Sequence, residues 1–276
     1  MSRWLDNLRR ALDASARPVD FFFRDDDAGW CDERLFALLD LFERQRLPID
    51  VAAIPRAVTP ALAAELRSRV AASPERLAVH QHGFAHVNHE TEGSKCEFGP
   101  SRPRALQLQD IESGRRLLSE VLGLHAGDIF TPPWNRCTEA TGEALRAAGL
   151  RVLSRDATAR PLGVMGLYEL PVRVDWFARR KGVRLSLEEL GASLAEAVSG
   201  VTSPVGVMFH HELMDEDERS RVGELLALLS AHPSVRCRLM FALAPVPSQP
   251  EATPSAVDDG VRRVSDQAPH MPALRS

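Results

Sequence analysis

The chain has 276 residues, 44% of them hydrophobic and 26% charged, which is enough to bury the core of one α/β domain without covalent cross-links. Its formal net charge of −4 argues against a nucleic-acid partner, because no broad positive field would attract phosphates. No apolar leader or bilayer-length apolar run is found, which predicts a cytoplasmic protein with no membrane contact. The four cysteines lack CxxC spacing and are expected to be reduced thiols: Cys31, Cys96, Cys137 and Cys237.

Predicted strands and helices alternate about seven times along the chain. Apolar residues at helical spacing predict a helix over residues 1–16, and the aromatic run at 19–23 predicts a strand that ends abruptly in three aspartates. Further helices are predicted over 32–46, 59–70, 103–122, 138–148, 186–199 and 216–231, and further strands over 49–54, 77–80, 128–130, 150–154, 168–174, 205–209 and 235–243. The alternation favours parallel strands with crossover helices: a (β/α) barrel of seven or eight strands, complete or slightly open, or a doubly wound sheet.

The predicted domain organisation is an N-terminal helix over 1–17, a barrel over 18–245 and a tail over 246–276. Pro, Ser, Asp and Arg dominate the tail and hydrophobic periodicity stops there, so it is expected to be disordered. The stretch from 83 to 102 also has little periodicity, and so long a loop in a compact domain is usually functional.

The conspicuous polar residues follow the predicted strands, at the point where each strand ends. They are Asp25 to Asp27, His80 to His89, Pro132 to Asn135, Asp175 with Trp176, and His210 with His211. Since the carboxyl ends of parallel strands meet on one rim of a barrel, and active sites are built there, we expect these side chains to converge.

His82 and His86 are four residues apart, so on a helical turn both imidazoles would face the same way and could bind one cation. The alternative is a polar loop with solvated histidines. The nearby aspartates are poor core residues, since a buried carboxylate needs a cation or hydrogen-bond donors. They would otherwise form an exposed turn neutralised by Arg24. His80 and His89 are candidates to orient the ligands by hydrogen bonds.

If one aspartate binds the metal, its neighbour is free to act as general base. In an unbroken strand Asp25 and Asp27 would share one face and Asp26 would oppose them. His210 is a candidate general acid, although a hydrogen-bonded core histidine is equally common, and His211 would point the other way. Trp134 and Trp176 offer flat faces suited to sugar rings, or they plug the mouth of the barrel.

Taken together, these motifs resemble those of the polysaccharide deacetylase family of carbohydrate esterases, in a divergent branch. The matching segments span residues from about 20 to 245: Arg24-Asp25-Asp26-Asp27-Ala28, His82-Gly83-Phe84-Ala85-His86, Thr131-Pro132-Pro133-Trp134-Asn135, Asp175-Trp176 and Phe209-His210. The resemblance implies a distorted (β/α) barrel that removes N- or O-acetyl groups with a divalent metal, usually zinc. It implies Asp27, His82 and His86 as metal ligands, Asp26 as base and His210 as acid.

The motifs also depart from the family pattern. Thr131 stands where the family has an arginine that holds the catalytic aspartate, and Arg24 or Arg136 is the candidate replacement. Arg173 stands where an upstream aspartate is usual, and Ala28 where glycine is common. The substrate is expected to contact His89, Trp134, Asn135, Arg136 and Trp176, with the loop at 87–102 shaping the pocket.

The predicted function is hydrolysis of an acetyl amide or ester on a carbohydrate, with an oligosaccharide or smaller sugar as substrate. An open site of two histidines and one carboxylate fits zinc, and also accepts iron, cobalt or manganese. One alternative is a barrel that binds a glycan or a partner without turnover. Another keeps the metal chemistry but acts on a non-sugar amide.

Overall fold

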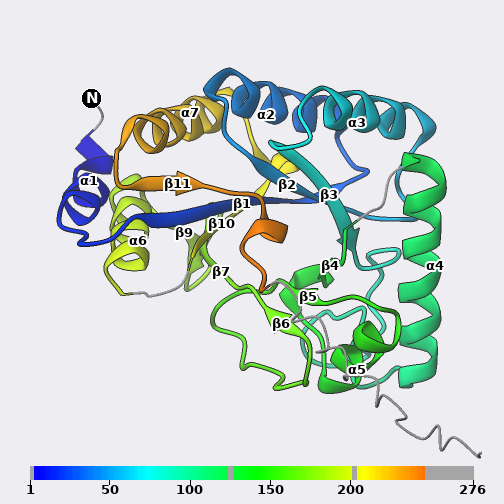
Figure 1. The fold of residues 1–276 in the computed structure, drawn as a ribbon. Helices are drawn as coiled ribbons and strands as arrows, with labels where there is room; N and C mark the ends of the chain where they lie inside the picture. The colour runs from blue at the N-terminus through cyan, green and yellow to red at the C-terminus, as the bar shows by residue number, and fades with distance from the viewer. Residues whose placement is uncertain (1–2, 124–126, 201–203, 246–276) are drawn as a thin grey trace, which may run out of the picture. The chain divides into compact units, whose positions relative to one another are not determined.

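The computed structural model describes residues 3–123, 127–200 and 204–245 (Figure 1). The chain divides into two compact units, Met1–Pro245 and Val246–Ser276, and the second lies wholly outside the described residues. The tail predicted over 246–276 therefore lies outside them as well. Among the helices of the described ranges, none is both long enough and apolar enough to cross a membrane.

The first unit is built around one parallel sheet, with neighbouring strands in the order β6-β5-β4-β3-β2-β1-β10-β7 and β11 pairing the start of β1. The strands are β1 (Val19–Ala28), β2 (Ile49–Ala53), β3 (Leu77–His82), β4 (Ile129–Thr131), β5 (Val152–Leu153), β6 (Tyr168–Glu169), β7 (Val172–Asp175), β10 (Val205–His210) and β11 (Val235–Cys237). An isolated bridge between Asp156 and Val172 links the segment after β5 to β7. The sheet thus curls into a distorted (β/α) barrel, as the alternation of elements predicted.

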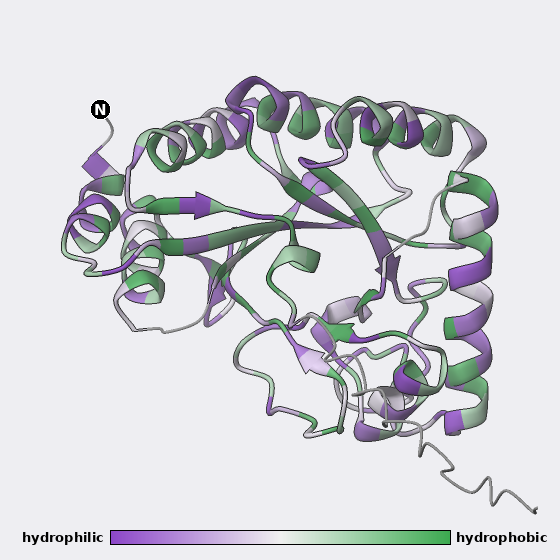
Figure 2. Ribbon diagram, in the orientation of Figure 1, coloured by the Kyte–Doolittle hydropathy of each residue, from purple (hydrophilic) through white to green (hydrophobic). Residues whose placement is uncertain are grey.

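Helices lie along the outside of the curled sheet, in the positions expected of crossover connections (Figure 1). They are α1 (Asp6–Asp13), α2 (Asp32–Gln45), α3 (Pro60–Ala72), α4 (Arg104–Leu122), α5 (Glu139–Ala147), α6 (Leu187–Ser199) and α7 (Glu216–Ala231). Short 3-10 helices are η1 (Arg3–Leu5), η2 (Pro133–Asn135), η3 (His211–Leu213) and η4 (Met240–Ala242), and β8 (Arg179–Arg180) pairs antiparallel with β9 (Val183–Arg184). Figure 2 shows hydrophobic strands against helices of mixed polarity.

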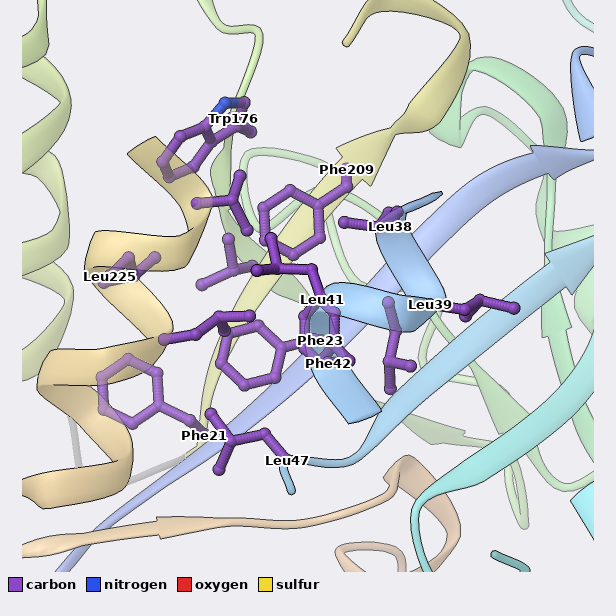
Figure 3. Close-up of a cluster of buried hydrophobic side chains, with 14 of the residues drawn as sticks. Phe21, Phe23, Leu38, Leu39, Leu41, Phe42, Leu47, Trp176, Phe209 and Leu225 are labelled. Atoms are coloured by element: carbon purple, nitrogen blue, oxygen red, sulfur yellow. The ribbon is translucent and has the colours of Figure 1, made fainter. Parts of the chain in front are cut away.

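Alternation along β1 sorts its side chains between two environments. Phe21 and Phe23 face the helices and join the main core, where Phe23 stacks on Phe209 with ring centroids 6.1 Å apart (Figure 3). Phe22 belongs to a second cluster inside the curl of the sheet, together with Met208. Continuing this period of two, Arg24 and Asp26 face the interior of the barrel and Asp25 faces the helices.

Two predicted strand ends were wrong. The first strand does not stop before the aspartates but runs to Ala28, so the acidic residues are part of the sheet. The last strand ends at Cys237 instead of Leu243, because the chain turns into η4. There the backbone N–H of Met240 donates to the buried side chain of Asp50 over 2.9 Å. The helix start predicted at Thr59 is confirmed, since its hydroxyl accepts from Leu62 N at 3.1 Å.

Asp25 forms an ion pair with a buried histidine, His211, which directly follows the neighbouring strand β10. The Nδ1 of His211 lies 2.6 Å from Asp25 Oδ2, and its Nε2 lies 2.7 Å from the carbonyl of Trp30. Both acceptors require a ring N–H, so the imidazole carries two protons. Burial lowers the pKa of His211, but the Asp25 carboxylate and the Trp30 carbonyl outweigh it and raise that pKa to about 9. This ion pair joins the end of β10 to β1 and to the turn that carries Trp30.

We expect this pair to make stability depend on pH. A histidine with its pKa raised from 6.5 to about 9 stabilises the fold fully below pH 6.5, and this contribution is lost as the pH rises to about 9. The wild type should therefore lose more free energy of unfolding between pH 6 and 9.5 than His211→Gln does. The difference is at most about 3 kcal/mol, because each tenfold change in proton affinity is about 1.4 kcal/mol. Urea unfolding at both pH values measures it, and equal losses in the two proteins would contradict it.

Candidate metal centre

A bulge in β1 determines which way the aspartates point. The register between β1 and β2 shifts between Asp25 and Ala28, and Asp27 has a left-handed backbone with φ of 70°. This corrects the expectation for an unbroken strand, in which Asp27 would share a face with Asp25. Instead Asp27 interacts with His82 and His210, the same histidines that act on Asp26, whereas Asp25 pairs with His211. The bulge thus brings two adjacent carboxylates to one site.

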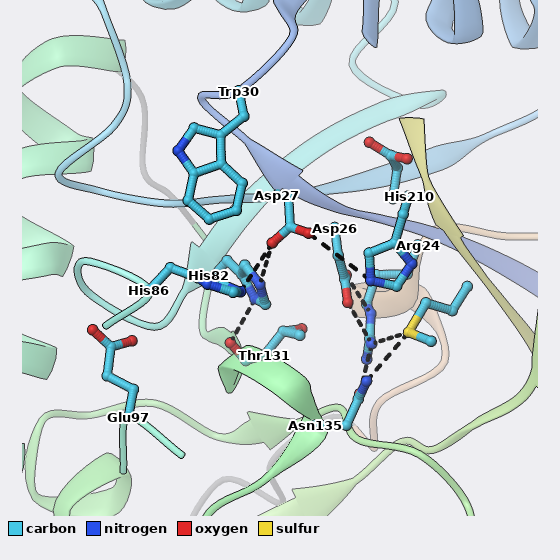
Figure 4. Close-up of polar contacts among 12 residues, drawn as sticks. Arg24, Asp26, Asp27, Trp30, His82, His86, Glu97, Thr131, Asn135 and His210 are labelled. Carbon is cyan, nitrogen blue, oxygen red and sulfur yellow. Dashed lines mark hydrogen bonds and ion pairs between the residues drawn. The ribbon is translucent and has the colours of Figure 1, made fainter. Parts of the chain in front are cut away.

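Asp27 faces both histidines of the predicted pair (Figure 4). Its Oδ1 is 3.1 Å from Nε2 of His82 and 3.1 Å from Nε2 of His86. One ligand atom from each of the three side chains lies within 4.8 Å of the other two, and among the described residues this is the group of His, Cys, Asp and Glu that could hold a metal ion. The three side chains come from β1, from the end of β3 and from the turn that follows β3.

His82 is oriented by the neighbouring strand. Its Nδ1 lies 3.0 Å from the main-chain carbonyl of Thr131, which only accepts, so Nδ1 carries the proton and Nε2 faces Asp27. Metal-binding histidines are typically fixed in this way. Burial lowers the pKa of His82, but Asp27 and Asp26 outweigh it and raise that pKa. The surroundings therefore favour a positive charge at this point.

His86 is reached by a bend and not by the helical turn that the four-residue spacing indicated. The left-handed φ of Gly83 (55°) and of His86 (56°) turns the chain back toward the barrel mouth. The His86 ring lies between two indoles, 4.8 Å from Trp30 and 4.4 Å from Trp134 between centroids. His82 and His86 thus meet at Asp27 as predicted, but a bend brings them together and not a helical turn.

Asp26 is held by Arg24, two residues earlier on the same strand. The Nε and Nη2 atoms of Arg24 donate to the two carboxylate oxygens over 2.8 and 2.9 Å, and Arg24 is fully buried. Arg24 also donates to Ser154 and to the side-chain oxygen of Asn135, each over 2.8 Å. Burial raises the pKa of Asp26, but Arg24 and the nearby His82 and His210 hold it below its usual range. Arg24 therefore contacts Asp26, whereas the other candidate, Arg136, is exposed and donates to the Lys95 carbonyl.

His210, at the end of β10, approaches the opposite side of Asp27. Its Nε2 lies 3.9 Å from Asp27 Oδ2, and about a quarter of its side chain is exposed. Asp175, at the end of β7, interacts electrostatically with His210, and burial raises the pKa of that aspartate. Figure 4 shows His210 and the ligand pair on opposite sides of the aspartates. The arrangement leaves a partly exposed imidazole beside the proposed metal position.

Other predicted residues lie at varying distances from the centre. His80 is buried, its Nε2 lies 2.9 Å from Thr131 Oγ1, and burial together with Arg24 lowers its pKa to about 3, so the ring is neutral. His89 is exposed, and its backbone N–H donates to the carbonyl of Cys96.

Trp134 is half-buried at the site, with Lys95 Nζ 6.0 Å from its ring. The platform expected at Trp176 is wrong: this indole is 1% exposed in the core and donates to Glu218.

The roles of three residues at the site could not be predicted from the sequence. Trp30 follows the acidic triplet closely, but nothing in the local pattern indicates that its ring contacts His86. The sequence shows only that Thr131 lacks a positive charge, whereas in the structure its carbonyl orients His82. Asp175 lies at a strand end on the same rim as His210, as predicted, but its interaction with that histidine was not predicted.

The donor set fits a divalent cation. Two imidazole nitrogens and a carboxylate oxygen, converging from one side, leave coordination positions open, which is the pattern of catalytic zinc and related sites. The raised pKa of His82 also favours a cation at this position, because Asp27 and Asp26 stabilise a positive charge there. Asp27, His82 and His86 are therefore the residues that would hold the ion.

Comparison with known proteins supports the fold. No protein-family model matches the sequence, and no curated protein matches it either. Among solved structures, a protein from Mycobacterium smegmatis assigned as a polysaccharide deacetylase has a TM-score of 0.63 at 16% identity, covering 86% of this chain and 96% of that one. A family 4 carbohydrate esterase from Streptomyces lividans in complex with acetate has a TM-score of 0.52 at 13% identity, covering 80% and 93%. The chain has the fold of the family 4 carbohydrate esterases.

Two further structures with this fold bear on metal and activity. A family 4 acetyl xylan esterase from Clostridium thermocellum, in complex with a cobalt ion, has a TM-score of 0.54 at 11% identity and covers 81% of this chain and 89% of that one. A family 4 pseudoenzyme from Bacillus anthracis has a TM-score of 0.53 at 9% identity, covering 83% and 66%. Structures with this fold thus include both a cobalt-bound esterase and a pseudoenzyme.

We expect Arg24 to be essential to the fold as well as to the site. Replacing it in Arg24→Met leaves the Asp26 carboxylate buried without its partner, which should lower the free energy of unfolding by about 3–5 kcal/mol. Arg236→Met is the matched control, because Arg236 bonds Asp20 through the same two atoms, over 3.0 Å each, at the surface.

The control should cost less than about 1 kcal/mol, as exposed ion pairs do. Denaturant unfolding of the three proteins measures both values. Similar losses in the two variants would show that the Arg24 pair is no more important than a surface pair.

Proposed function

We propose that the protein is a metal-dependent hydrolase of the polysaccharide deacetylase type, which removes acetyl groups from a carbohydrate. The observation that carries the proposal is the convergence of Asp27, His82 and His86 on one point, beside a second aspartate held by an arginine and an accessible histidine. The shared fold with family 4 carbohydrate esterases supports it.

Each side chain has a distinct role in the proposal. Asp27, His82 and His86 hold the divalent cation, which when bound supplies a Lewis acid and lowers the pKa of water. Asp26 accepts the proton of the attacking water, and its pairing with Arg24 keeps it ionised for that task. His210 donates a proton from Nε2 to the nitrogen or oxygen that leaves.

These proton movements balance for hydrolysis. The water oxygen forms a bond to the acetyl carbon, the bond from that carbon to the sugar nitrogen or oxygen breaks, and acetate and the free amine or hydroxyl leave. The negative oxygen that develops in between needs a hydrogen-bond donor. We assign this to the backbone N–H of Trp134, since the next amide, that of Asn135, already donates to the Pro132 carbonyl over 3.0 Å.

Zinc is the proposed cation, because imidazole and carboxylate ligands suit it and its sites bind three protein groups and leave a position open. Cobalt in the acetyl xylan esterase with this fold supports a divalent ion of this kind. The proposed substrate is a sugar ring that contacts the indoles of Trp30 and Trp134 on either side of His86, since aromatic faces match the apolar faces of sugars.

The competing proposal is a barrel that binds a glycan or a partner without turnover. The lack of an arginine at position 131 favours it, as does the fold shared with a pseudoenzyme. The Arg24 pairing weakens the first of these arguments, because Asp26 has an arginine partner. A third candidate, hydrolysis of a non-sugar amide, differs only in the substrate, and a screen of acetylated sugars against linear and cyclic amides separates it from the first.

We predict that His82→Ala abolishes metal binding and hydrolysis together. The substitution removes a ligand nitrogen that lies 3.1 Å from Asp27 and is fixed by Thr131, so the remaining two ligands bind the ion weakly. Elemental analysis of protein purified without added metal, with an assay on chromogenic acetyl esters, measures both properties. A variant that keeps its full metal content would show that His82 is not a ligand.

We predict the opposite pattern for Asp26→Asn. This carboxylate is not in the ligand group, so the variant should keep its metal while losing about 10²- to 10⁴-fold in kcat, the usual contribution of a general base. If the metal-loaded wild type itself hydrolyses no acetylated substrate, the binding alternative is favoured. If the variant hydrolyses as fast as the wild type, Asp26 is not the base.

A further inference from the structure

We propose that Glu97 is a positioning residue for the metal centre, which fixes His86 through the two peptide groups that precede it. The inference rests on the proposed metal site, because it concerns how one of its ligands is held. Glu97 lies eleven residues beyond His86, in the aperiodic loop that the sequence assigned to the substrate pocket.

Glu97 binds the turn between His82 and His86 with both carboxylate oxygens. Its Oε2 accepts from the backbone N–H of Phe84 over 3.1 Å, and its Oε1 accepts from that of Ala85 over 2.7 Å. The side chain is fully buried, and neither Phe84 nor Ala85 lies in a helix or strand. One carboxylate thus satisfies two consecutive amides that would otherwise require other buried partners.

Three further backbone groups of the turn are bound by the strands and by the loop after β2. The Gly83 N–H donates to the Thr131 carbonyl over 3.0 Å, the Gly83 carbonyl accepts from Gln81 Nε2 over 2.9 Å, and the Phe84 carbonyl accepts from Arg56 N over 3.0 Å. These bonds fix the first half of the turn. Glu97 fixes the half that leads into His86, whose left-handed backbone then aims the imidazole at Asp27.

Close approach of the carboxylate depends on a glycine. A Cβ added to Gly83 would lie 2.2 Å from Glu97 Oε2 and 2.5 Å from Pro133, and the φ of Gly83 is left-handed as well. The sequence His82-Gly83-Phe84-Ala85-His86 therefore includes space for an acid supplied by a distant part of the loop. Glu97 itself is not in the ligand group, and each of its oxygens accepts from a peptide N–H of the turn.

The residues on either side of Glu97 make it a rigid support. Cys96 and Phe98 are both buried, and the Phe98 ring packs edge-on against Phe130 with centroids 5.3 Å apart. A β-bridge joins Phe98 to Cys137, and the Cys96 N–H donates to the side chain of Asn88 over 2.8 Å. The loop thus carries a fixed carboxylate to the metal centre, which gives the long aperiodic segment a function independent of the substrate.

The test compares Glu97→Gln with Glu90→Gln. Glu90 is a matched control, because it lies on the same loop, accepts from the N–H and hydroxyl of Ser101, and also approaches a glycine, Gly99. In Glu97→Gln one of the turn's N–H groups meets an NH₂ group instead of an oxygen. Two measurements are made on each purified full-length protein: hydrogen exchange of the 83–87 amides without metal, and titration with Zn²⁺.

We expect Glu97→Gln to increase the exchange of the Phe84 and Ala85 amides at least 10-fold and to weaken Zn²⁺ binding about 10- to 100-fold, the usual effect of losing a group that orients ligands. Glu90→Gln should leave both unchanged. A purely structural role would lower thermal stability without weakening Zn²⁺ binding by the folded protein.

The inference would be overturned if a folded Glu97→Gln protein had the same Phe84 and Ala85 exchange rates and the same Zn²⁺ affinity as the wild type. If Glu97→Gln does not fold, Glu97→Asp decides, since it keeps the charge but withdraws the carboxylate by one methylene. It should fold and bind Zn²⁺ more weakly, and wild-type affinity would overturn the inference. If the wild type binds no Zn²⁺, the proposed function fails, whereas the exchange comparison still tests the link between Glu97 and the turn.

Discussion

Two adjacent carboxylates reach the same mouth of the barrel because β1 bulges at Asp27, where the backbone is left-handed. Such charges repel each other when they are buried side by side, so each needs favourable polar neighbours. Arg24 pairs with Asp26, and His82 and His86 both face Oδ1 of Asp27. The proposed division of the pair into a metal ligand and a general base rests on these different neighbours.

The same strand separates three consecutive aspartates into three environments. Asp25 faces the helices and forms a buried ion pair with His211, Asp26 faces the barrel interior and Arg24, and Asp27 faces the histidines at the mouth. Position 131 holds a threonine, and the arginine that contacts Asp26 is Arg24 on the same strand. The Thr131 carbonyl instead orients His82.

Much of the fold and of the site could be predicted from the sequence, because strand ends in a parallel barrel converge whatever the details of each strand. Hydrophobic periodicity predicted the helices, and the order of the motifs predicted that Asp27, His82 and His86 would lie together. What periodicity could not predict were departures from regular geometry: the bulge at Asp27, the bend before His86 and the end of the last strand at Cys237. Each depends on contacts between distant residues. Trp176 was misplaced for the same reason, since its local sequence resembles a turn while its ring completes the core.

The proposed chemistry requires a cation where Asp27 meets the two histidines. Anomalous X-ray scattering at the zinc edge, from crystals of the protein loaded with Zn²⁺, locates such an ion. We expect a peak within about 2.0–2.2 Å of a carboxylate oxygen of Asp27 and of the Nε2 atoms of His82 and His86. A strong peak bound by other residues, or full loading with no peak at this point, would contradict it.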